Sequence, residues 1–292
     1  MRHPARSPVA YLFVLPAAIF FAAFYLYPAV MTLRYSVTDW DGYSPDIRFV
    51  GLSNFTRLFT TDIIFQQALG NTLRFMLVVV ILQTFFSLML ALLLVRNTRG
   101  TIALRTLYFF PTILSSVSVG LIWLFIYDPY FGLINETLRR VGADGVQPNW
   151  LGNPAIALYA LALTQVWFHV GQMMVIYVAG LQQIPAEVFE AASVDGAGTW
   201  DKFRRITWPL LLPTTVLVMA YTTMQSFRAF ELVWSMTQGG PEGATEILAT
   251  LIYKTGLLNF QIGMATAQSV IFMLLILSVF WIQRRAAALA VR

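Results

Sequence analysis

The chain has 292 residues, of which 58% are hydrophobic and only 11% are charged. In a soluble domain, about a quarter of the residues are charged. This composition excludes an ordinary soluble protein and predicts an all-α membrane protein with several spans. There is no cysteine, which excludes disulfides and thiolate chemistry, and the only two histidines, His3 and His169, are too far apart for a short metal motif. The net charge of +5 follows membrane topology, as shown below, so it does not indicate a nucleic-acid partner.

Six apolar segments of about 20 residues predict six transmembrane helices. They cover residues 9–31, 75–95, 102–127, 155–181, 208–227 and 263–282. The first follows a basic MRHPAR segment, as in a signal peptide, but its apolar stretch is too long and no clear A-x-A site follows, so we expect a membrane helix. Pro16, Pro111 and Pro213 fall inside or near the ends of spans, where neighbouring helices can satisfy the backbone groups that they free.

The distribution of charge predicts the orientation of these spans. The short connection RNTRGTIALR carries three arginines and no acid, and 10 of the 14 acidic residues fall on the opposite side of the membrane. Both termini are therefore expected in the cytoplasm. The longer outer connections predict short amphipathic helices in SNFTRLFTTDIIFQQALGN and EILATLIYKTGLL, the first with Ser53 and Asn54 as candidate N-caps. No repeat or low-complexity linker divides the chain, so residues 1–292 are expected to form one domain.

Polar residues gather on one face of the fourth predicted span and on one face of the fifth. The two sets are Gln165, His169 and Gln172 at i, i+4, i+7, and Thr222, Gln225 and Ser226 at i, i+3, i+4. Polar groups inside a membrane are costly and usually face the interior of the bundle, so these faces predict a substrate pathway for a solute rich in hydroxyls. Trp167, Phe168 and Tyr221 could stack on a sugar ring. The alternative is hydrogen bonding that only holds the helices together.

Between these two spans, residues 187–213 read EVFEAASVDGAGTWDKFRRITWPLLLP. Pro185 is expected at the first position of a helix and Glu187 in its first turn. Gly196 and Gly198 are expected to end this helix, one of them in a left-handed cap. Thr199 is then a candidate N-cap for a second short helix before the fifth span.

The first of these two helices is built to be approached closely. Ala191 and Ala192 favour a helix and add almost no bulk, while acids precede them and basic residues follow. This pattern predicts a docking element that enters a groove on a cytoplasmic partner. A plain amphipathic helix on the membrane surface is the alternative.

The segment EAASVDGAGTWDKFRRITWP closely resembles the EAA loop of the permease subunits of binding-protein-dependent ABC importers. The positions that match are Glu190, Ala191, Ala192, Asp195, Gly196, Ala197, Ile206 and Pro209. Trp208 stands where leucine is usual. The segment FRAFELVWSMTQGGPEGATEILATLIYKTGL is also similar to carbohydrate-type permeases, with Glu231 in place of the usual Asp and Gln238 in place of a glycine. With FVGLSNFTRLFTTDIIFQQALGNTLRF, which resembles maltose/glycerol-phosphate-like permeases, the likeness covers residues from about 10 to 285.

The resemblance implies a type I ABC importer permease fold in a bacterial or archaeal inner membrane. It implies uptake of a carbohydrate, such as a disaccharide or oligosaccharide, with residues 184–209 as the loop that couples transport to an ATPase dimer. It also implies a soluble solute-binding protein outside. Because the chain has a single EAA loop and an importer core needs two permease halves, a second, different permease chain is expected.

The chain has no Walker A motif, since neither of its lysines, Lys202 and Lys254, follows a glycine. We therefore expect no cofactor in this chain and no enzymatic activity, with ATP and Mg on the partner ATPase. A stand-alone carrier would be expected to hold a carboxylate in mid-membrane, and none lies in the middle of a predicted span. An intramembrane enzyme would need a catalytic dyad or a metal cluster, and a serine dyad stays open.

The cargo itself stays open at this stage. Glycerol phosphate, a polyamine or an amino acid are the alternatives to a sugar, and the neutral polar faces favour a neutral sugar. Arg228 and Glu231, three residues apart beyond the fifth span, predict a local ion pair, with contact to the binding protein as the alternative.

Overall fold

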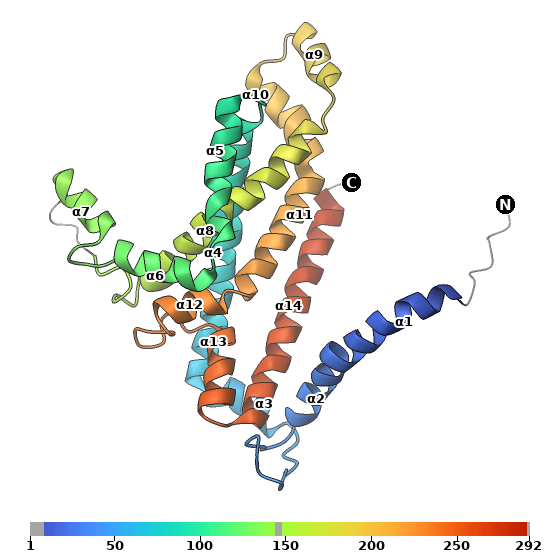
Figure 1. Cartoon of the computed structure of the whole chain (residues 1–292), viewed down its shortest axis with the longest axis vertical. Coiled ribbons are helices and arrows are strands. Elements are labelled where there is room, and N and C mark those ends of the chain that lie inside the picture. Colours follow the sequence, from blue (N-terminus) through green and yellow to red (C-terminus); the bar gives the residue numbers. More distant parts are fainter. Residues whose placement is uncertain (1–8, 144–147, 291–292) are drawn as a thin grey trace. The chain divides into compact units, whose positions relative to one another are not determined.

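A computed structural model describes residues 9–143 and 148–290. Within these ranges the regular structure is helical, and the only β-pairing is an isolated bridge between Thr38 and Phe49. The elements shown in Figure 1, with intervening π- and 3₁₀-turns labelled η, are α1 Val9–Phe21, η1 Ala22–Leu26, α2 Tyr27–Tyr35, α3 Ser53–Thr60, α4 Ile63–Leu94, α5 Arg99–Phe109, η2 Phe110–Ile113, α6 Ser116–Ile126, α7 Leu133–Arg140, α8 Ala157–Gln182, α9 Ala186–Val194, α10 Thr199–Lys202, η3 Phe203–Thr207, α11 Trp208–Phe227, α12 Phe230–Met236, α13 Leu248–Tyr253, η4 Lys254–Leu258 and α14 Ile262–Ala290. The all-α membrane fold is confirmed.

Five helical runs are long and apolar enough to cross a membrane. They are Leu12–Tyr35, Ile63–Leu94, Ala157–Gln182, Thr199–Phe227 and Ile262–Ala288. These runs cover the first, second, fourth, fifth and sixth predicted spans. The second begins at Ile63, earlier than expected, because the apolar-periodic residues before position 75 continue the same helix. The two amphipathic helices of the outer connections are also present, as α3 and as the run Leu248–Leu258, although Leu52 rather than Ser53 or Asn54 is the N-cap of α3.

The third predicted span is not one helix. It divides into Arg99–Ile113 and Ser116–Ile126, which are bent by 102° from one another. Pro111 explains the break, because it has no N–H to donate and its ring disfavours a continuing helix. After it, Leu114 is extended and Ser115 caps α6 by accepting a hydrogen bond from the N–H of Ser118 at 3.2 Å. The third span is thus a bent pair of helices rather than one straight helix, and with this pair taken as one span the described residues form six.

The chain divides into two compact units, residues 1–63 with 252–274 and residues 64–251 with 275–292. In the first unit, Asn54 holds the loop that follows α2 by donating to the carbonyls of Ser36 and Thr38 at 3.0 and 2.8 Å. The N–H of Gly263, at the start of α14, donates to the carbonyl of Trp40 at 2.8 Å. The expectation of one domain for residues 1–292 stays a prediction.

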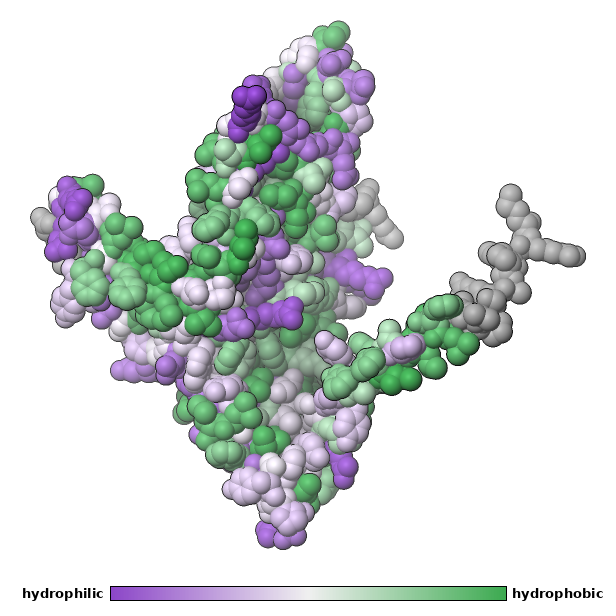
Figure 2. Space-filling view, in the orientation of Figure 1, coloured by the Kyte–Doolittle hydropathy of each residue, from purple (hydrophilic) through white to green (hydrophobic). Residues whose placement is uncertain are grey.

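The second unit is built around α8, which lies against α4, α5 and α11 (Figure 1). One core cluster joins Phe75 of α4, Leu161 of α8 and Val233 of α12, and another joins Tyr177 of α8 and Leu211 of α11. The outward sides of α5 and α6 expose apolar residues, which form green areas in Figure 2 and suit contact with lipid.

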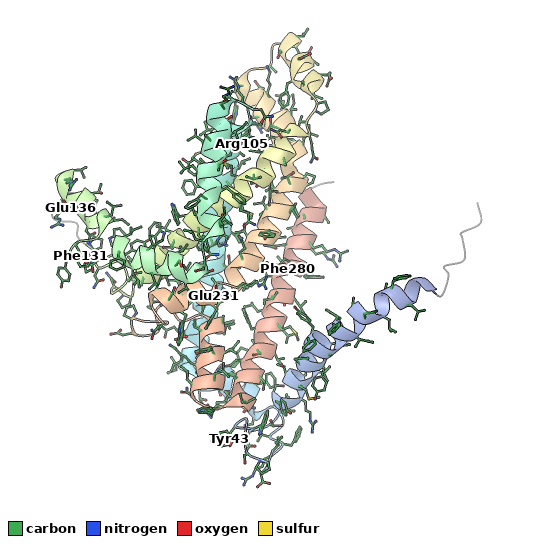
Figure 3. All side chains as sticks on the ribbon, in the orientation of Figure 1. Tyr43, Arg105, Phe131, Glu136, Glu231 and Phe280 are labelled. Carbon is green, nitrogen blue, oxygen red and sulfur yellow. The ribbon has the colours of Figure 1, made fainter. Side chains whose placement is uncertain are left out.

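An arginine fixes the connection between α4 and α5. Arg105, labelled in Figure 3, donates from Nε to the carbonyl of Leu94 at 2.7 Å and from Nη1 to Oδ1 of Asn97 at 3.1 Å. It thereby satisfies a carbonyl at the C-terminus of α4, which no residue of that helix can reach. Gln182, at the end of α8, donates to the same Asn97 oxygen at 3.2 Å.

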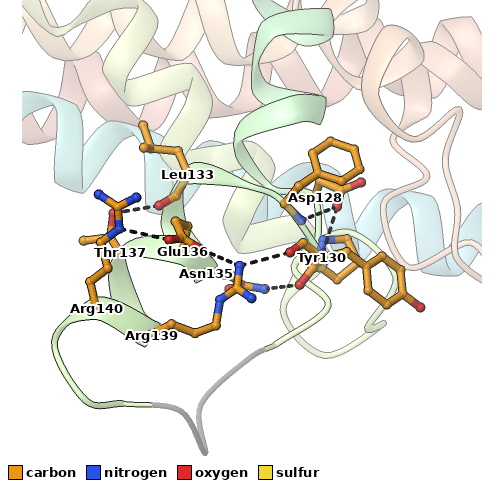
Figure 4. A network of polar contacts seen from close by, with 10 residues as sticks. Asp128, Tyr130, Leu133, Asn135, Glu136, Thr137, Arg139 and Arg140 are labelled. Atoms are coloured by element: carbon orange, nitrogen blue, oxygen red, sulfur yellow. Dashed lines mark hydrogen bonds and ion pairs between the residues drawn. The ribbon is translucent and has the colours of Figure 1, made fainter.

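The connection between α6 and α8 contains the short helix α7, where several side chains form a network of polar contacts (Figure 4). Asp128 accepts hydrogen bonds from the N–H groups of Tyr130 and Phe131 at 2.8 and 3.0 Å. Glu136 accepts from Nε of Arg140 at 2.9 Å and pairs with Arg139. The hydrogen bond from Arg140, followed by the charge of Arg139, lowers the pKa of Glu136 below its ordinary value.

Candidate coupling surface and solute cavity

The stretch predicted to dock on a partner folds as α9 and α10, joined at Gly196. The N–H of Gly196 donates to the carbonyl of Ser193 at 3.1 Å, and the N–H of Ala197 donates to that of Ala192 at 2.9 Å, which is a Schellman motif. Gly196 has φ +78°, so the predicted left-handed cap is confirmed there. Gly198, at φ −70°, instead precedes α10 as its N-cap.

Three details of this stretch differ from expectation. Pro185 is the N-cap of α9 rather than its first residue, and Thr199 begins α10 instead of capping it. More importantly, α10 is not a separate short helix, because the run Thr199–Phe227 continues through η3 into α11. In η3 a wider turn pairs the N–H of Trp208 with the carbonyl of Phe203, directly before Pro209. A wide turn at this position lets the helix pass a residue that has no N–H to donate.

The surface of α9 is left open in this chain, because none of its residues is buried. At the turn after it lies a cavity of about 460 Å³, which is lined by Ala192, Asp195, Gly196, Ala197, Asp201, Arg205 and Ile206. Of the predicted coupling residues, Glu190, Ala191 and Pro209 lie outside this lining and are exposed. Lys202 donates to Oγ of Ser193 at 2.7 Å and so ties α10 to α9. In Figure 1 this pair of helices lies at one end of the second unit, beyond α8 and α11.

The polar faces of the fourth and fifth spans meet at a second cavity. It has a volume of about 250 Å³ and is lined by Ser116, Gln165, His169, Tyr221, Gln225, Arg228, Ala229 and Leu232. His169 is held by a contact of 3.3 Å between its Nδ1 and the carbonyl of Gln165. Three of the six predicted pathway residues, Gln165, His169 and Gln225, therefore line one hollow between α8 and α11.

The other three predicted pathway residues serve the helix bundle. Thr222 and Ser226 are buried, and Oγ of Ser226 donates to the carbonyl of Thr222 at 2.9 Å. Gln172 links the helices, since its Oε1 accepts from Nε2 of Gln225 at 2.9 Å and its Nε2 donates to the hydroxyl of Tyr221 at 3.3 Å. Gln172 and Thr222 are thus bonded to a neighbouring helix, whereas Ser226 is bonded to its own helix.

The structure adds residues that the two-face pattern did not include. Gln83 of α4 is fully buried, and its Nε2 donates to Oε1 of Gln225 at 3.1 Å and lies 3.4 Å from Oγ1 of Thr222. A lone glutamine in an apolar span was the available signal. Ser116 joins the cavity only because Pro111 breaks the third span, which a reading of one straight helix could not anticipate.

Arg228 gives the cavity a cationic group. Among the described residues, the expected ion pair of Arg228 with Glu231 is not formed, whereas ion pairs do form at Glu136 and Asp201. Of the candidate stacking residues, Tyr221 lines the cavity, Phe168 is buried in the core, and Trp167 meets Trp123 edge to face. In the described ranges no three His, Cys, Asp or Glu side chains gather as a metal site would require.

Comparison with known proteins identifies the family. Residues 83–288 match the family described as "Binding-protein-dependent transport system inner membrane component". The diacetylchitobiose uptake system permease protein of Streptomyces coelicolor is 34% identical over 267 residues, which are 88% of this chain and 75% of that protein. The sn-glycerol-3-phosphate transport system permease protein of Agrobacterium fabrum is 34% identical over 280 residues, 94% of this chain and 93% of that protein.

A solved structure shares the fold. It is a bacterial alginate ABC transporter in complex with an alginate pentasaccharide-bound periplasmic protein, with a TM-score of 0.84 and 22% identity, covering 98% of this chain and 96% of that one. The expected importer permease fold is thereby confirmed. The chain is a multi-pass membrane permease and belongs to the family of inner-membrane components of binding-protein-dependent transport systems.

Proposed function

We propose that this chain is the transmembrane subunit of an ATP-driven importer, that it lines the path of a carbohydrate, and that residues 184–209 couple this path to a cytoplasmic ATPase. The observation that carries the proposal is α9, a helix with no buried residue that is held at a defined angle by the Schellman motif at Gly196. A helix with an accessible surface and small alanine side chains fits a groove on a partner. The EAA pattern of Glu190, Ala191 and Ala192 lies on this helix.

The partners follow from this arrangement. An ATPase dimer binds ATP and Mg and docks on α9, with the cavity lined by Ala192 and Gly196 receiving one of its side chains. A second, different permease chain completes the core, and a solute-binding protein delivers the cargo from outside. Both termini and α9 then lie in the cytoplasm, in agreement with the distribution of charge.

The mechanism is alternating access. Closure of the ATPase dimer moves α9 and α10, and α10 belongs to the same helical run as α11. Movement of α10 is therefore transmitted to Gln225. This residue lies about 39 Å from Thr199 along the run, at ~1.5 Å per residue. The helices around the cavity open outward to accept the solute, and they open inward after hydrolysis to release it.

The chemistry of the cavity supports a carbohydrate cargo. Gln165 and Gln225 offer amide donors and acceptors, and Tyr221 offers a ring and a hydroxyl, which together match the hydroxyls and the flat face of a sugar. The similarity to a diacetylchitobiose permease supports the same cargo. Arg228, with the similarity to a glycerol-phosphate permease, favours a second candidate, a solute that carries a phosphate.

The test is ATPase activity and uptake in proteoliposomes of the assembled complex, with wild type compared to Glu190→Lys and Gly196→Asp. Both variants are expected to abolish ATP-driven uptake. The bundle should keep its unfolding temperature, because positions 190 and 196 are exposed and lie outside the core. Gly198→Ala is the matched control, since a Cβ at Gly198 meets only Oδ2 of Asp201, at an ordinary 3.9 Å. Uptake by the chain alone, unaffected by both variants, would show a stand-alone carrier and overturn the proposal.

A further inference from the structure

Three glutamines from three helices form a chain of hydrogen bonds beside the solute cavity. Gln83 of α4 donates to Gln225 of α11 at 3.1 Å, and Gln225 donates to Gln172 of α8 at 2.9 Å. We call these three residues the amide belt. Only Gln225 among them also lines the cavity, so one side chain belongs to both the solute site and the contact between helices.

The belt is incompletely satisfied at its buried end. Gln83 is 0% exposed, and within the described ranges its Oε1 has no hydrogen-bond partner. A buried carbonyl without a donor is unfavourable, so an arrangement that supplies a donor to this oxygen competes with the one observed. An arrangement of the belt that gives this oxygen a donor would therefore be favoured over the one observed.

A solute in the cavity acts on this balance through Gln225. A hydroxyl that donates to Oε1 of Gln225 adds a second donor to that oxygen, which weakens and reorients the hydrogen bond from Nε2 of Gln83. Once that bond is weakened, α11 is released from α4, and α11 continues into α10 at the coupling surface. The belt thus connects the occupancy of the cavity to the helix that approaches the ATPase.

We propose that Gln83 is a positioning residue that holds α11 against α4 in the empty transporter and releases it when solute binds Gln225. This inference rests on the proposed function, because it needs an ATPase coupled to α11. It requires no contact between Gln83 and the solute. It predicts that removal of Gln83 imitates the presence of solute.

The test measures ATP hydrolysis by the assembled complex in proteoliposomes without any solute. Gln83→Leu is expected to raise this basal rate about fivefold, as the loss of one buried hydrogen bond implies, and to lower the further stimulation by loaded binding protein accordingly. Ser87→Ala is the matched control: Ser87 lies one turn further along α4, is equally buried, and donates only to carbonyls of its own helix, at 2.5 and 3.1 Å. It is expected to leave the basal rate unchanged.

Two further readouts separate positioning from general damage. The double variant Gln83→Leu with Gln225→Leu is expected to equal Gln225→Leu alone in basal rate, because both changes break the same bond. Spin labels on cysteines at Phe85 of α4 and Leu217 of α11, both exposed, are expected to show a second distance population in Gln83→Leu. The cysteine-free chain makes this labelling specific.

The outcomes are distinct. A wild-type basal rate in Gln83→Leu, or an equal rise in Ser87→Ala, would overturn the role of Gln83 while Glu190→Lys still tests the proposed function separately. If Gln83→Leu does not assemble, Gln83→Met carries the same test, because a thioether has no hydrogen to donate to Gln225. If Glu190→Lys leaves uptake intact, the proposed function itself fails.

Discussion

The coupling surface and the solute cavity use polar residues in opposite ways. On α9 and at the turn after it, polar and small side chains are exposed and have few partners within the chain. Around the cavity, Gln83, Thr222 and Ser226 are buried and bonded to neighbouring helices or to their own helix. The first region is open to a partner. In the second, these buried side chains are bonded within the chain apart from Oε1 of Gln83, and Gln165, His169 and Gln225 face the hollow. A change in the first region should therefore affect coupling, and a change in the second should affect the bundle or the cargo.

The largest loss of stability is expected from a change at Gly171 of α8, which belongs to the helix bundle and not to the coupling surface. A Cβ there would overlap the carbonyl oxygen of Tyr108 in α5, which as part of the backbone cannot move aside. Gly171→Ala is expected to destabilise the bundle by more than about 4 kcal/mol, so that little folded protein is recovered. The measurement is thermal unfolding of the purified chain in detergent. Gly70→Ala is the control, because its Cβ meets open space, and alanine within a helix is favoured by ~1 kcal/mol. A wild-type unfolding temperature for Gly171→Ala would contradict this account of the α5–α8 contact.

Next in size is the effect of Arg228 on cargo. Hydrogen bonds to a charged group contribute about 1.5–3 kcal/mol, so Arg228→Gln should raise the KM for uptake about tenfold or more. If the cargo is a neutral sugar, Arg228→Lys should raise the KM as much as Arg228→Gln does, because the paired donors of the guanidinium are lost. If the cargo carries a phosphate, Arg228→Lys should retain most of the uptake. Diacetylchitobiose and sn-glycerol 3-phosphate are the two solutes to compare, and an unchanged KM for both would remove Arg228 from the pathway.

A smaller effect is expected at the turn of the coupling surface. Gly196→Ala forces a side chain into the left-handed region at a cost of about 1–2 kcal/mol, although its Cβ meets no atom within 4 Å. The Schellman motif should loosen, and uptake per ATP hydrolysed should fall while the unfolding temperature of the bundle stays constant. Gly198→Ala, at φ −70°, should change neither quantity. Equal loss in both variants would mean that the angle between α9 and α10 does not matter.

The turn at Gly196 and most of the spans could be predicted from the sequence, whereas the bend in the third span could not. The left-handed glycine at Gly196 was predictable because a local pattern of residues determines a Schellman turn. Five of the six spans were predictable because their apolar length reports the thickness of the membrane. The bend after Pro111 was not, since prolines at Pro16 and Pro213 lie within helices that continue.

The cavity was only partly predictable for a related reason. Helical spacing placed Gln165 and His169 on one face of the fourth span and Gln225 on one face of the fifth, and all three line the cavity. It could not tell which of the six residues would face a hollow, because that depends on the neighbouring helix. Gln83 contacts Gln225 across 142 positions of sequence, and no periodicity in one span reports such a contact.

The smallest effect concerns pH at α7. The pKa of Glu136 is lowered by its hydrogen bond from Arg140 and by the charge of Arg139, so this contact stabilises α7 above the ordinary carboxyl pKa and is lost as pH falls through the lowered pKa. A fluorophore on a cysteine at Ala143 should show rising mobility as the pH is reduced below about 4. Glu136→Gln should remove that pH dependence. A transition of the same size in Glu136→Gln would assign it to another group.

The central claim, that α9 is covered by an ATPase, is tested most directly by labelling a single cysteine. In the cysteine-free chain, Ala192→Cys places a thiol in the cavity beside Gly196, and Thr137→Cys places one on the exposed helix α7 as a control. The rates of maleimide labelling are measured for the permease with and without its ATPase subunits, in detergent so that both sides are accessible. The account predicts that assembly slows labelling at position 192 and leaves position 137 unchanged. Equal labelling of position 192 in both samples, with the ATPase bound, would contradict it.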